Sequence, residues 1–304
     1  MKPVIIDHIV KSYTTKKDKV IAVDDVSFEV EKGEIFGIIG PDGAGKTSLF
    51  RMMATLLIPD SGKALIDDLD TVKDYKAIRE RIGYMPGRFS LYQDLTVEEN
   101  INFFATIFNT TRQKNYELVK DIYSQIEPFK NRRAGKLSGG MKQKLALSCA
   151  LIHKPSVLLL DEPTTGVDAV SRKEFWEMLK NLRRQGITIL VSTPYMDEAG
   201  MCDRIALIQN GKILSLNTPK GITENFGKSL LAAKSSNMLN LLKRLKTAPG
   251  VEDAYPFGEY HHVVLNKSHN RPELENYIAA EQPDVEIVSA EPNIEDCFMN
   301  LMKD

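Results

Sequence analysis

Short apolar runs along the first part of the chain predict strands. Residues 1–39 contain short strands, among which VSFEV at 26–30 alternates apolar with polar positions. IFGIIG at 35–40, SVLLLDE at 156–162 and ITILVST at 187–193 are instead continuous apolar runs. A continuous run bounded by turn residues is typical of a strand that is covered on both faces.

Segments with helical spacing alternate with these strands. KTSLFRMMATLL at 46–57 and VSRKEFWEMLKNLRRQ at 170–185 repeat apolar residues with the period of a helix, and Gly186 ends the second one. Residues 96–154 are mostly helical in period. Because strands alternate with helices, we expect an α/β domain with a largely parallel sheet.

The pattern changes near residue 228. The segments KSLLAAKS, SNMLNLLKRLKT, VEDAYPF, EYHHVVLN, RPELENYIAAE and DVEIVSAE predict, in that order, strand, helix, strand, strand, helix and strand. This order is a split βαβ unit of the ferredoxin-like type, on which a last helix, NIEDCFMNLMKD, is expected to pack. We therefore predict a first domain over residues 1–227, with a helical subdomain at about 96–154, and a small α+β accessory domain over 228–304.

Composition is that of a globular protein. The 304 residues are 42% hydrophobic and 27% charged, which is enough for a substantial core. The net charge of −1 leaves no basic surface excess for nucleic acid. The three cysteines are scattered, which favours a reducing compartment. No apolar run is long enough to span a membrane and the N-terminus lacks a signal-peptide core, so we expect a cytoplasmic protein.

GPDGAGKT at 40–47 joins a buried strand to a helix and matches the pattern of a phosphate-binding loop. Its glycines allow backbone N–H groups to surround phosphate oxygens, and the helix N-terminus adds its dipole. We expect Lys46 to reach the β- and γ-phosphates and Thr47 to offer its hydroxyl to Mg²⁺. An ordinary glycine-rich turn would explain the glycines but not this lysine and threonine.

Two further segments carry candidate chemistry. LLLDEP ends a buried strand in Asp161, placed to hold a magnesium-bound water, and Glu162, placed to polarise the attacking water. By themselves, two acids at a strand end are as readily explained as solvated side chains. In KLSGGMKQKLALSCALI, Ser138 is a candidate cap for a helix that begins around Gly140 or Met141. Gly139 and Gly140 beside the cap expose N–H groups that can bind an anion.

In order and spacing, these segments resemble the ATP-binding domain of ABC transporters over roughly residues 4–226. GPDGAGKT is similar to the Walker A loop, VLLLDE to Walker B, LSGGM to the signature LSGGQ, and TTGVD at 164–168 to the D-loop. The resemblance implies a P-loop NTPase fold of the ABC type, with a mixed sheet and a helical signature subdomain. It also implies ATP and Mg²⁺ as cofactors, with Glu162 as the catalytic residue and Thr47 and Asp161 as the metal-holding residues.

The resemblance places Tyr13 where the family stacks an aromatic ring on adenine; a buried tyrosine at a strand end is the alternative. The residues that it implies for ATP binding are Tyr13, Gly40, Pro41, Asp42, Gly43, Ala44, Gly45, Lys46, Thr47, Ser48, Ser138, Gly139 and Gly140.

The family also implies partners. Its ATP sits between two domains, with the Walker segments from one and the signature from the other, so that binding closes a dimer and hydrolysis lets it open. We expect an integral membrane permease subunit and a second ATP-binding domain, either a copy of this chain or, preferably, a non-identical one. The tail with its PNIEDCFMNLM ending resembles that of drug-efflux and ABC-2 exporters. That likeness implies export, and the family implies a place at the inner face of the cell membrane. From the net charge of −1 we expect no nucleic-acid partner.

Three positions depart from the family. Pro194 stands in the slot of the switch histidine, and proline can neither donate to a phosphate nor orient a water. It also suits the end of a strand and the start of a helix, YMDEAG. Gly87 stands in the slot of the Q-loop glutamine, since Gln93 lies too far along, and Asp42 replaces a commoner asparagine. We expect nucleotide binding to be kept and hydrolysis at this face to be slow.

Other functions remain as alternatives. A nucleotide-gated module that binds ATP with little turnover would also fit Pro194 and Gly87. An ABC ATPase that acts on ribosomes or DNA would need features such as a second ATP domain or a coiled coil. A P-loop kinase would leave LSGGM unexplained.

Overall fold

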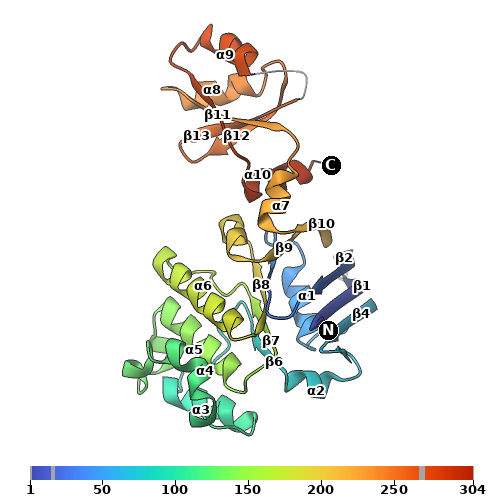
Figure 1. Ribbon diagram of the computed structural model, residues 1–304, viewed down its shortest axis with the longest axis vertical. Coiled ribbons are helices and arrows are strands. Elements are labelled where there is room, and N and C mark those ends of the chain that lie inside the picture. Colours follow the sequence, from blue (N-terminus) through green and yellow to red (C-terminus); the bar gives the residue numbers. More distant parts are fainter. Residues whose placement is uncertain (1, 15–17, 267–270, 304) are drawn as a thin grey trace. The chain divides into compact units, whose positions relative to one another are not determined.

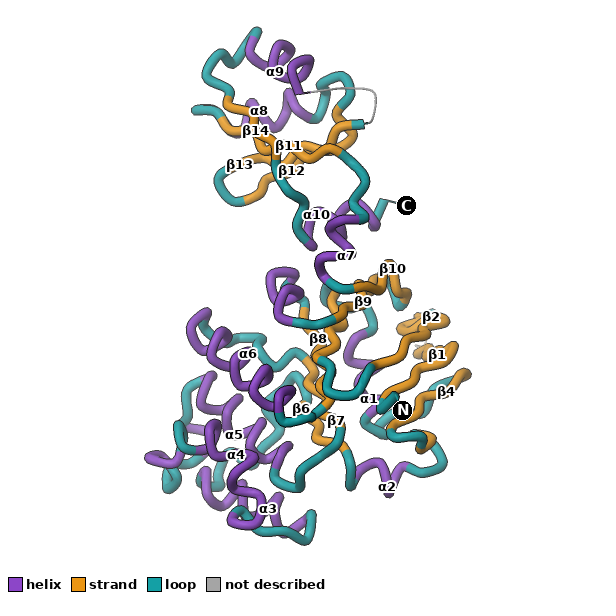
Figure 2. The backbone as a smooth tube through the Cα atoms, in the orientation of Figure 1, coloured by secondary structure: helices purple, strands orange, loops and turns teal. Residues whose placement is uncertain are grey.

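The computed structural model describes residues 2–14, 18–266 and 271–303 (Figures 1 and 2). Its chain divides into two compact units, Met1–Pro219 and Lys220–Asp304. The division comes before the boundary expected after residue 227, because helix α7 (Pro219–Glu224) falls almost wholly within the second unit.

A six-stranded sheet is the centre of the first unit. Its strands lie in the order β10 (Lys212–Asn217), β9 (Arg204–Gln209), β3 (Ile35–Ile39), β8 (Thr188–Thr193), β7 (Val157–Asp161) and β6 (Ile82–Met85). β10 pairs antiparallel with β9, and the other neighbours pair in parallel. Every residue of β3, β7 and β8 is buried, as the continuous apolar runs predict.

The N-terminal strands form a separate antiparallel sheet, so the short strands expected over residues 1–39 are wrong in length. Its order is β2 (Lys19–Val30), β1 (Val4–Thr14), β4 (Ser61–Ile66) and β5 (Leu69–Asp70). The pairing of β1 with β2 shifts register near Ile6, Ile9 and Lys11. Such irregularities break the strict alternation by which a long strand is recognised from sequence.

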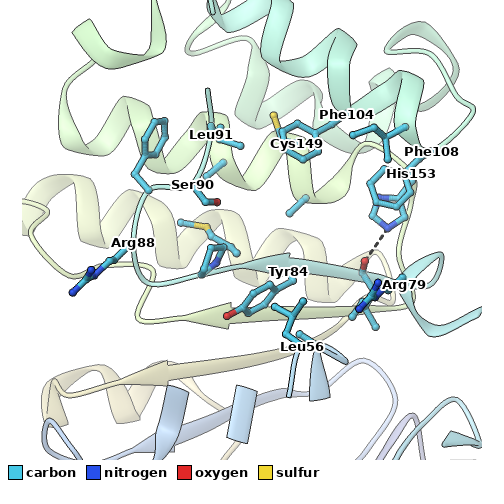
Figure 3. Close-up of a pocket in the computed structure, with 18 of the residues that line it drawn as sticks. Leu56, Arg79, Tyr84, Arg88, Ser90, Leu91, Phe104, Phe108, Cys149 and His153 are labelled. Carbon is cyan, nitrogen blue, oxygen red and sulfur yellow. Dashed lines mark hydrogen bonds between the residues drawn. The ribbon is translucent and has the colours of Figure 1, made fainter. Parts of the chain in front are cut away.

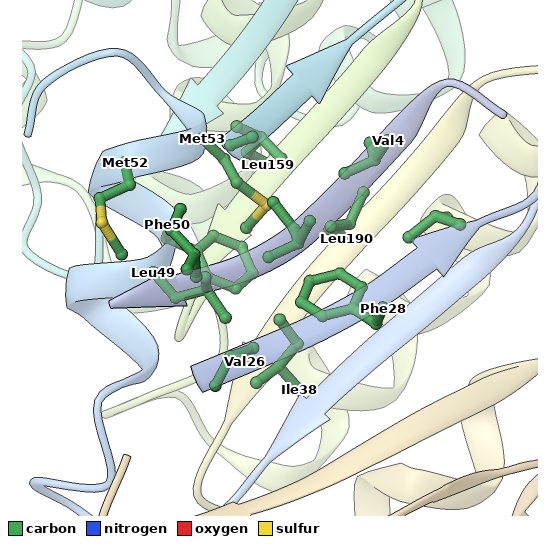
Figure 4. Close-up of a cluster of buried hydrophobic side chains, with 14 of the residues drawn as sticks. Val4, Val26, Phe28, Ile38, Leu49, Phe50, Met52, Met53, Leu159 and Leu190 are labelled. Atoms are coloured by element: carbon green, nitrogen blue, oxygen red, sulfur yellow. The ribbon is translucent and has the colours of Figure 1, made fainter. Parts of the chain in front are cut away.

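A hydrophobic core joins the two sheets around helix α1 (Lys46–Met53) (Figure 4). Leu49 and Phe50 of this helix are buried among strand residues of both sheets. Phe28 of β2 stacks on Phe36 of β3, with ring centroids 5.1 Å apart. The core therefore fixes α1, and with it the loop that precedes the helix, against the ends of the parallel strands.

The remaining helices of the first unit include the expected helical subdomain near 96–154. It consists of α3 (Val97–Ile107), α4 (Tyr116–Tyr123) and α5 (Gly139–Leu151), with 3₁₀ turns at Gln113–Asn115, Glu127–Phe129 and Ala134–Lys136; α2 (Tyr75–Arg79) and α6 (Ala169–Arg184) lie outside it. Thr96 and Glu99 begin α3 with a reciprocal capping box.

Two expected helices differ from their predictions. α1 ends at Met53, short of the segment 46–57, because Thr55 adopts a left-handed φ of 60°. The segment after Pro194 forms a 3₁₀ turn, η4 (Met196–Met201), in place of the expected α-helix.

The second unit has the strand order of a ferredoxin-like fold. Its antiparallel sheet runs β12 (Val251–Phe257), β13 (Tyr260–Leu265), β11 (Ser229–Lys234) and β14 (Glu286–Ser289), with α8 (Met238–Leu245) and α9 (Arg271–Ala279) as the two crossover helices. Leu241, Leu245 and Ile278 from these helices are buried against Val263 and Leu265 of the sheet. The split βαβ pattern of the sequence is thus present in the fold.

The last helix, α10 (Ile294–Leu301), attaches to the opposite side of this sheet. His262 alternates along β13 with Val263, so it points to the face away from α8 and α9. The fully buried carboxylate of Asp296 in α10 accepts a hydrogen bond from the Tyr255 hydroxyl at 2.7 Å and lies 2.7 Å from His262 Nδ1.

Within the described part of the chain, no helix combines the length and apolar character needed to cross a membrane.

Candidate nucleotide-binding site

The loop between β3 and α1 has a shape that requires its glycines. Gly43 and Gly45 have φ of 80° and 103°, a region that side chains rarely tolerate. A Cβ at Gly45 would also lie 2.1 Å from the carbonyl oxygen of Ala22, and one at Gly40 would lie 2.0 Å from that of Ile208. A side chain at either glycine would clash with neighbouring backbone. Without side chains there, the loop can present its backbone N–H groups to a ligand.

Lys46 lies folded inside this loop. Its ammonium group donates to the carbonyl oxygens of Gly40 at 2.8 Å and Pro41 at 3.0 Å, and its side chain is only 2% exposed. The same nitrogen is 3.2 Å from Oε1 of Glu162. The positive charge is therefore held between the loop and the end of β7, where an anionic ligand of the loop would meet it.

Asp161 ends β7 and is almost completely buried. Its Oδ1 accepts hydrogen bonds from Ser192 Oγ at 2.7 Å and Thr47 Oγ1 at 3.2 Å. A carboxylate and a hydroxyl at this distance form the hard oxygen set that Mg²⁺ prefers. Thr47 and Asp161 thus fit the metal that the sequence implies.

Glu162 has a left-handed φ of 51°, which is uncommon for a residue other than glycine. Its N–H donates to the carbonyl and hydroxyl oxygens of Ser192 at 3.1 and 2.9 Å, and these bonds hold the turn. The turn directs the half-buried carboxylate past the strand end, next to Lys46. Backbone strain at such a position is found most often at functional sites.

Ser192 is a residue of this site that no sequence motif indicates. It lies in β8 directly opposite Asp161 of β7, and it binds both Asp161 and the N–H of Glu162. The available signal was a hydroxyl residue at the end of the apolar run ITILVST. Only the pairing of β7 with β8 shows which carboxylate this hydroxyl binds.

Tyr13 lies near the end of β1 with 39% of its surface exposed, so it is not the buried tyrosine considered as the alternative. Its hydroxyl is 3.0 Å from Ser48 Oγ in α1. Asp60 holds the preceding residue, because its Oδ2 accepts from the Ser12 N–H at 2.7 Å and from the Ser12 hydroxyl at 2.6 Å. The ring is thereby tied at both ends beside the helix that follows the phosphate loop.

Ser138 caps α5, and its Oγ accepts from the N–H of Met141 at 3.4 Å. The helix begins at Gly139, one or two residues before the start expected at Gly140 or Met141. A Cβ at Gly140 would lie 2.7 Å from Ser171 Oγ in α6, so the two helices approach closely at this glycine. The LSGGM residues therefore lie against the start of α6, beyond the TTGVD segment.

Gly87 and Pro194 both border the acidic pair. A Cβ at Gly87 would lie 3.0 Å from the Asp161 carbonyl oxygen and 3.6 Å from Glu162 Cβ. Pro194 directly follows β8, the strand that pairs with β7. Gly87 thus lies beside the acidic pair, and Pro194 follows the end of the strand whose Ser192 pairs with Asp161. Asp42, by contrast, is exposed on the loop.

A groove of about 640 Å³ is bordered by the segment that contains Gly87 (Figure 3). Its lining is mainly apolar and comes from β6, the segment 86–91, α3 and α5; it includes Tyr84, Leu91, Phe104, Phe108, Cys149 and His153. Figure 3 shows the Arg88 side chain pointing away from the other labelled residues. Pro86 and Arg88, the residues on either side of Gly87, both line the groove.

Comparison with known proteins agrees with this geometry. Residues 23–165 match the family model described as ABC transporter. The chain is 40% identical over 285 residues to the probable multidrug ABC transporter ATP-binding protein YbhF of Escherichia coli K12, which covers 92% of this chain and 49% of YbhF. It is 37% identical over 245 residues to the ABC transporter ATP-binding protein NatA of Bacillus subtilis 168, which covers 79% of this chain and 96% of NatA.

The chain thus spans about half the length of YbhF and most of that of NatA. Among solved structures, it is similar to the ATP-binding cassette MJ0796 in a dimeric post-hydrolysis state bound to ADP and Pi, with a TM-score of 0.65 and 26% identity over 71% of this chain and 98% of that one. NatA is matched over 96% of its length at 37% identity, which shows the family: the chain belongs to the ATP-binding proteins of ABC transporters.

Proposed function

We propose that this chain binds Mg-ATP and hydrolyses it to power an exporter. The observation that carries the proposal is the meeting of two pairs of side chains at one point. Lys46 Nζ is 3.2 Å from Glu162 Oε1, and Thr47 Oγ1 is 3.2 Å from Asp161 Oδ1. A cation, a metal-binding hydroxyl and two carboxylates beside a phosphate loop are the parts that phosphoryl transfer needs.

In this proposal, the loop residues 40–47 hold the phosphates through backbone N–H groups, and Lys46 turns from its carbonyl partners to the β- and γ-phosphate oxygens. Thr47 and Asp161 hold Mg²⁺, which when bound neutralises charge on the phosphate oxygens. Tyr13, tied to Ser48, offers its ring to the adenine base. Asp42 is exposed, so its carboxylate has room to stay away from the phosphates.

Glu162 is the proposed general base. Its carboxylate is half-buried at the end of β7, and its backbone is fixed by Ser192. A base in this position accepts a proton from the water that attacks the γ-phosphate.

A second ATP-binding domain is the proposed partner at the LSGGM surface. Ser138, Gly139 and Gly140 present the N-terminus of α5, which is a ready anion site. The dimeric state named for the MJ0796 cassette supports a pair of this kind. We propose a non-identical partner, since a self-pair would carry the Gly87 and Pro194 losses in both of its sites.

The apolar groove beside Gly87 is the proposed contact with a membrane permease. Its walls come from β6, α3 and α5, and exposed aromatic residues, Tyr92 and Phe103, pack edge to face near it, with centroids 4.8 Å apart. An exposed apolar surface of this kind is typical of an interaction site. This contact would hold the chain at the inner face of the membrane.

Export is the proposed direction of transport. YbhF is named a probable multidrug transporter protein, and a Nod factor export ATP-binding protein of Rhizobium sp. strain N33 is 33% identical over 93% of this chain and 92% of its own length. The second candidate function is a nucleotide-gated module with little turnover, which is favoured by the lack of a ligand side chain at Gly87 and Pro194.

A binding measurement tests the proposal. Lys46→Ala removes a charge-assisted contact, so affinity for Mg-ATP by calorimetry should fall about 10- to 100-fold. Lys63→Ala, an exposed lysine on β4, is the matched control and should bind like the parent. Equal affinity of the Lys46→Ala variant and the parent would overturn the assignment. Turnover that is lost in Glu162→Gln would favour the ATPase over the gated module.

A further inference from the structure

Glu198 is a buried carboxylate between the two segments that flank the catalytic candidate. It lies in η4 and is 4% exposed. Its Oε2 accepts hydrogen bonds from the hydroxyl of Thr193 at 2.6 Å and from that of Thr164 at 3.1 Å. Thr164 lies in the turn that follows Glu162, and Thr193 ends β8 directly before Pro194. One carboxylate oxygen therefore joins the segment of the base to the strand end beside it.

Thr193 links this carboxylate to the phosphate loop. Its carbonyl oxygen accepts from the N–H of Gly40 at 3.3 Å, and its hydroxyl oxygen accepts from the N–H of Tyr195 at 3.1 Å. The backbone on both sides of Pro194 is therefore held by one threonine, which is itself held by Glu198. A displacement of Glu198 would reach the first residue of the loop as well as position 194.

Thr164 makes the corresponding link on the other side. It is 1% exposed, and its carbonyl oxygen accepts from the N–H of Val167 at 3.2 Å. The N–H of Thr165 donates to the carbonyl oxygen of Glu162 at 3.3 Å, so the turn from the base to Thr164 is closed by its own backbone. The hydroxyl of Thr164 is thus a short rigid connection between Glu162 and Glu198.

The charge of Glu198 is only loosely paired. Arg172 Nη1, from the first turns of α6, is 3.9 Å from Oε1, which has no hydrogen-bond partner among the described residues. Arg172 also stacks over the ring of Tyr195 at 4.7 Å and donates to Asp197 at 3.3 Å. Burying a carboxylate on such terms is unfavourable for stability compared with an apolar side chain. The unfavourable burial of this carboxylate indicates that Glu198 contributes to the positions of its two threonine partners and not to stability.

We propose that Glu198 is a positioning residue for ATP hydrolysis in this chain. It sets the distance between the turn that carries Glu162 and the strand end at Thr193, where Pro194 offers no side-chain hydrogen bond of its own. This inference rests on the proposed role of Glu162. Glu198 acts through the two threonine hydroxyls and does not itself touch the nucleotide.

The test compares single-turnover hydrolysis by the full chain, with protein in excess, and nucleotide affinity for the same variants. Glu198→Ala should slow hydrolysis about 10- to 100-fold, the loss of hydrogen bonds to a buried charge. Its affinity for ATP should fall much less than its rate, because the hydrogen bond from Gly40 to Thr193 is only one of the contacts that hold the phosphate loop. Glu198→Gln keeps an oxygen acceptor for both hydroxyls and should restore most of the rate.

Threonine variants keep the proposal testable if Glu198→Ala fails to fold. Thr193→Val and Thr164→Val remove one hydroxyl each at nearly constant volume, and each should slow hydrolysis. Combined with Glu198→Ala, neither should add its full effect, because the residues act as one unit. Hydrolysis at the parental rate in both threonine variants would overturn the proposal.

Two controls separate positioning from stability. Glu34→Ala removes another buried glutamate, next to β3, and Thr188→Val removes another buried hydroxyl, at the opposite end of β8. Both should lower the melting temperature without slowing hydrolysis, and an equal slowing in either one would also overturn the proposal. Glu162→Gln tests the proposed function separately. If it abolishes hydrolysis while Glu198→Ala does not slow it, only the inference about Glu198 fails.

Discussion

Ser192, Gly87 and Pro194 are the three residues whose neighbours decide how the acidic pair can work. Ser192 fixes Asp161 and the backbone of Glu162 by hydrogen bonds of 2.7 and 2.9 Å. Gly87 faces the same backbone with no side chain, and Pro194 closes the adjoining strand. The proposed base is thus well held by the protein, while neither Gly87 nor Pro194 supplies a side chain that could bind a phosphate.

Restoring these groups should speed hydrolysis. A lost catalytic contact costs roughly 10²–10³ in rate, and an introduced side chain regains only part of it. We expect single-turnover hydrolysis to be about tenfold faster or more in the Gly87→Gln, Pro194→His variant than in the parent. The position of a Cβ at Gly87, 3.0 Å from the Asp161 carbonyl oxygen, requires a small backbone shift, so Pro194→His should also be measured alone.

Gly87→Ala is the steric control for this comparison. It adds the same close contact without an amide, so it should not accelerate hydrolysis. A parent that already hydrolyses ATP at rates ordinary for the family, with Glu162→Gln abolishing them, would contradict the expectation. Pro194 would then only terminate the strand.

At the scale of elements, His153, which follows the end of α5, connects this helix to β6. Its Nε2 lies 2.9 Å from the carbonyl oxygen of Ile82, and its ring stacks on Phe108 with centroids 3.8 Å apart. Burial lowers the pKa of His153, against a smaller opposing effect of the Ile82 carbonyl. The contact between α5 and β6 is therefore made by the neutral imidazole.

This burial predicts a pH dependence of stability. Because the folded-state pKa of His153 is below its unfolded value near 6.5, the stabilisation is present above that pH and is lost as the pH falls below it. The melting temperature of the parent should therefore drop between pH 7.5 and 5.5. In His153→Gln, whose amide can still donate to Ile82, the drop should be smaller.

His8 provides a control of opposite sign. A hydrogen bond to Asp25 raises the pKa of this exposed histidine, so its contribution is present below its unfolded pKa and lost as the pH rises. His8→Asn suits its left-handed φ of 48° and should make the drop at low pH slightly larger. An unchanged pH profile in His153→Gln would show that other groups cause the loss.

Element types were predictable where one periodic pattern runs through a whole segment. The continuous runs of β3, β7 and β8 and the split βαβ order of the second unit are of this kind. The Ser138 cap of α5 was indicated by a local motif instead. The long β1 and β2 were not predictable, because their register shifts interrupt the alternation. The end of α1 was missed for a similar reason, since the left-handed φ of Thr55 has no clear sequence signal.

At the scale of the whole molecule, the apolar groove predicts where a permease makes contact. Cysteines placed at Arg88 and Tyr92, both exposed beside the groove, should crosslink to an integral membrane protein in isolated membranes. The three native cysteines are buried, so background labelling should be low. The readout is a higher-mass band that is absent without crosslinker.

Glu177→Cys, exposed on α6 outside the groove, is the matched control and should give no such band. Equal crosslinking from all three positions would indicate non-specific contact. A chain that never sediments with membranes, even when neighbouring genes are expressed with it, would contradict the proposed permease partner.

The sequence by itself determined the phosphate loop, the acidic strand end, the capped signature helix and the alternation of strands with helices. These features depend on residues close together in the chain, whose spacing sets backbone shape and burial directly. Only the tertiary structure decided that Ser192 binds the Asp161 carboxylate and that Gly87 lies against the backbone carbonyl of Asp161. The same holds for Glu198, which joins Thr164 to Thr193. The physical reason is that strand order and register bring these residues together across long separations, and no local period encodes that pairing.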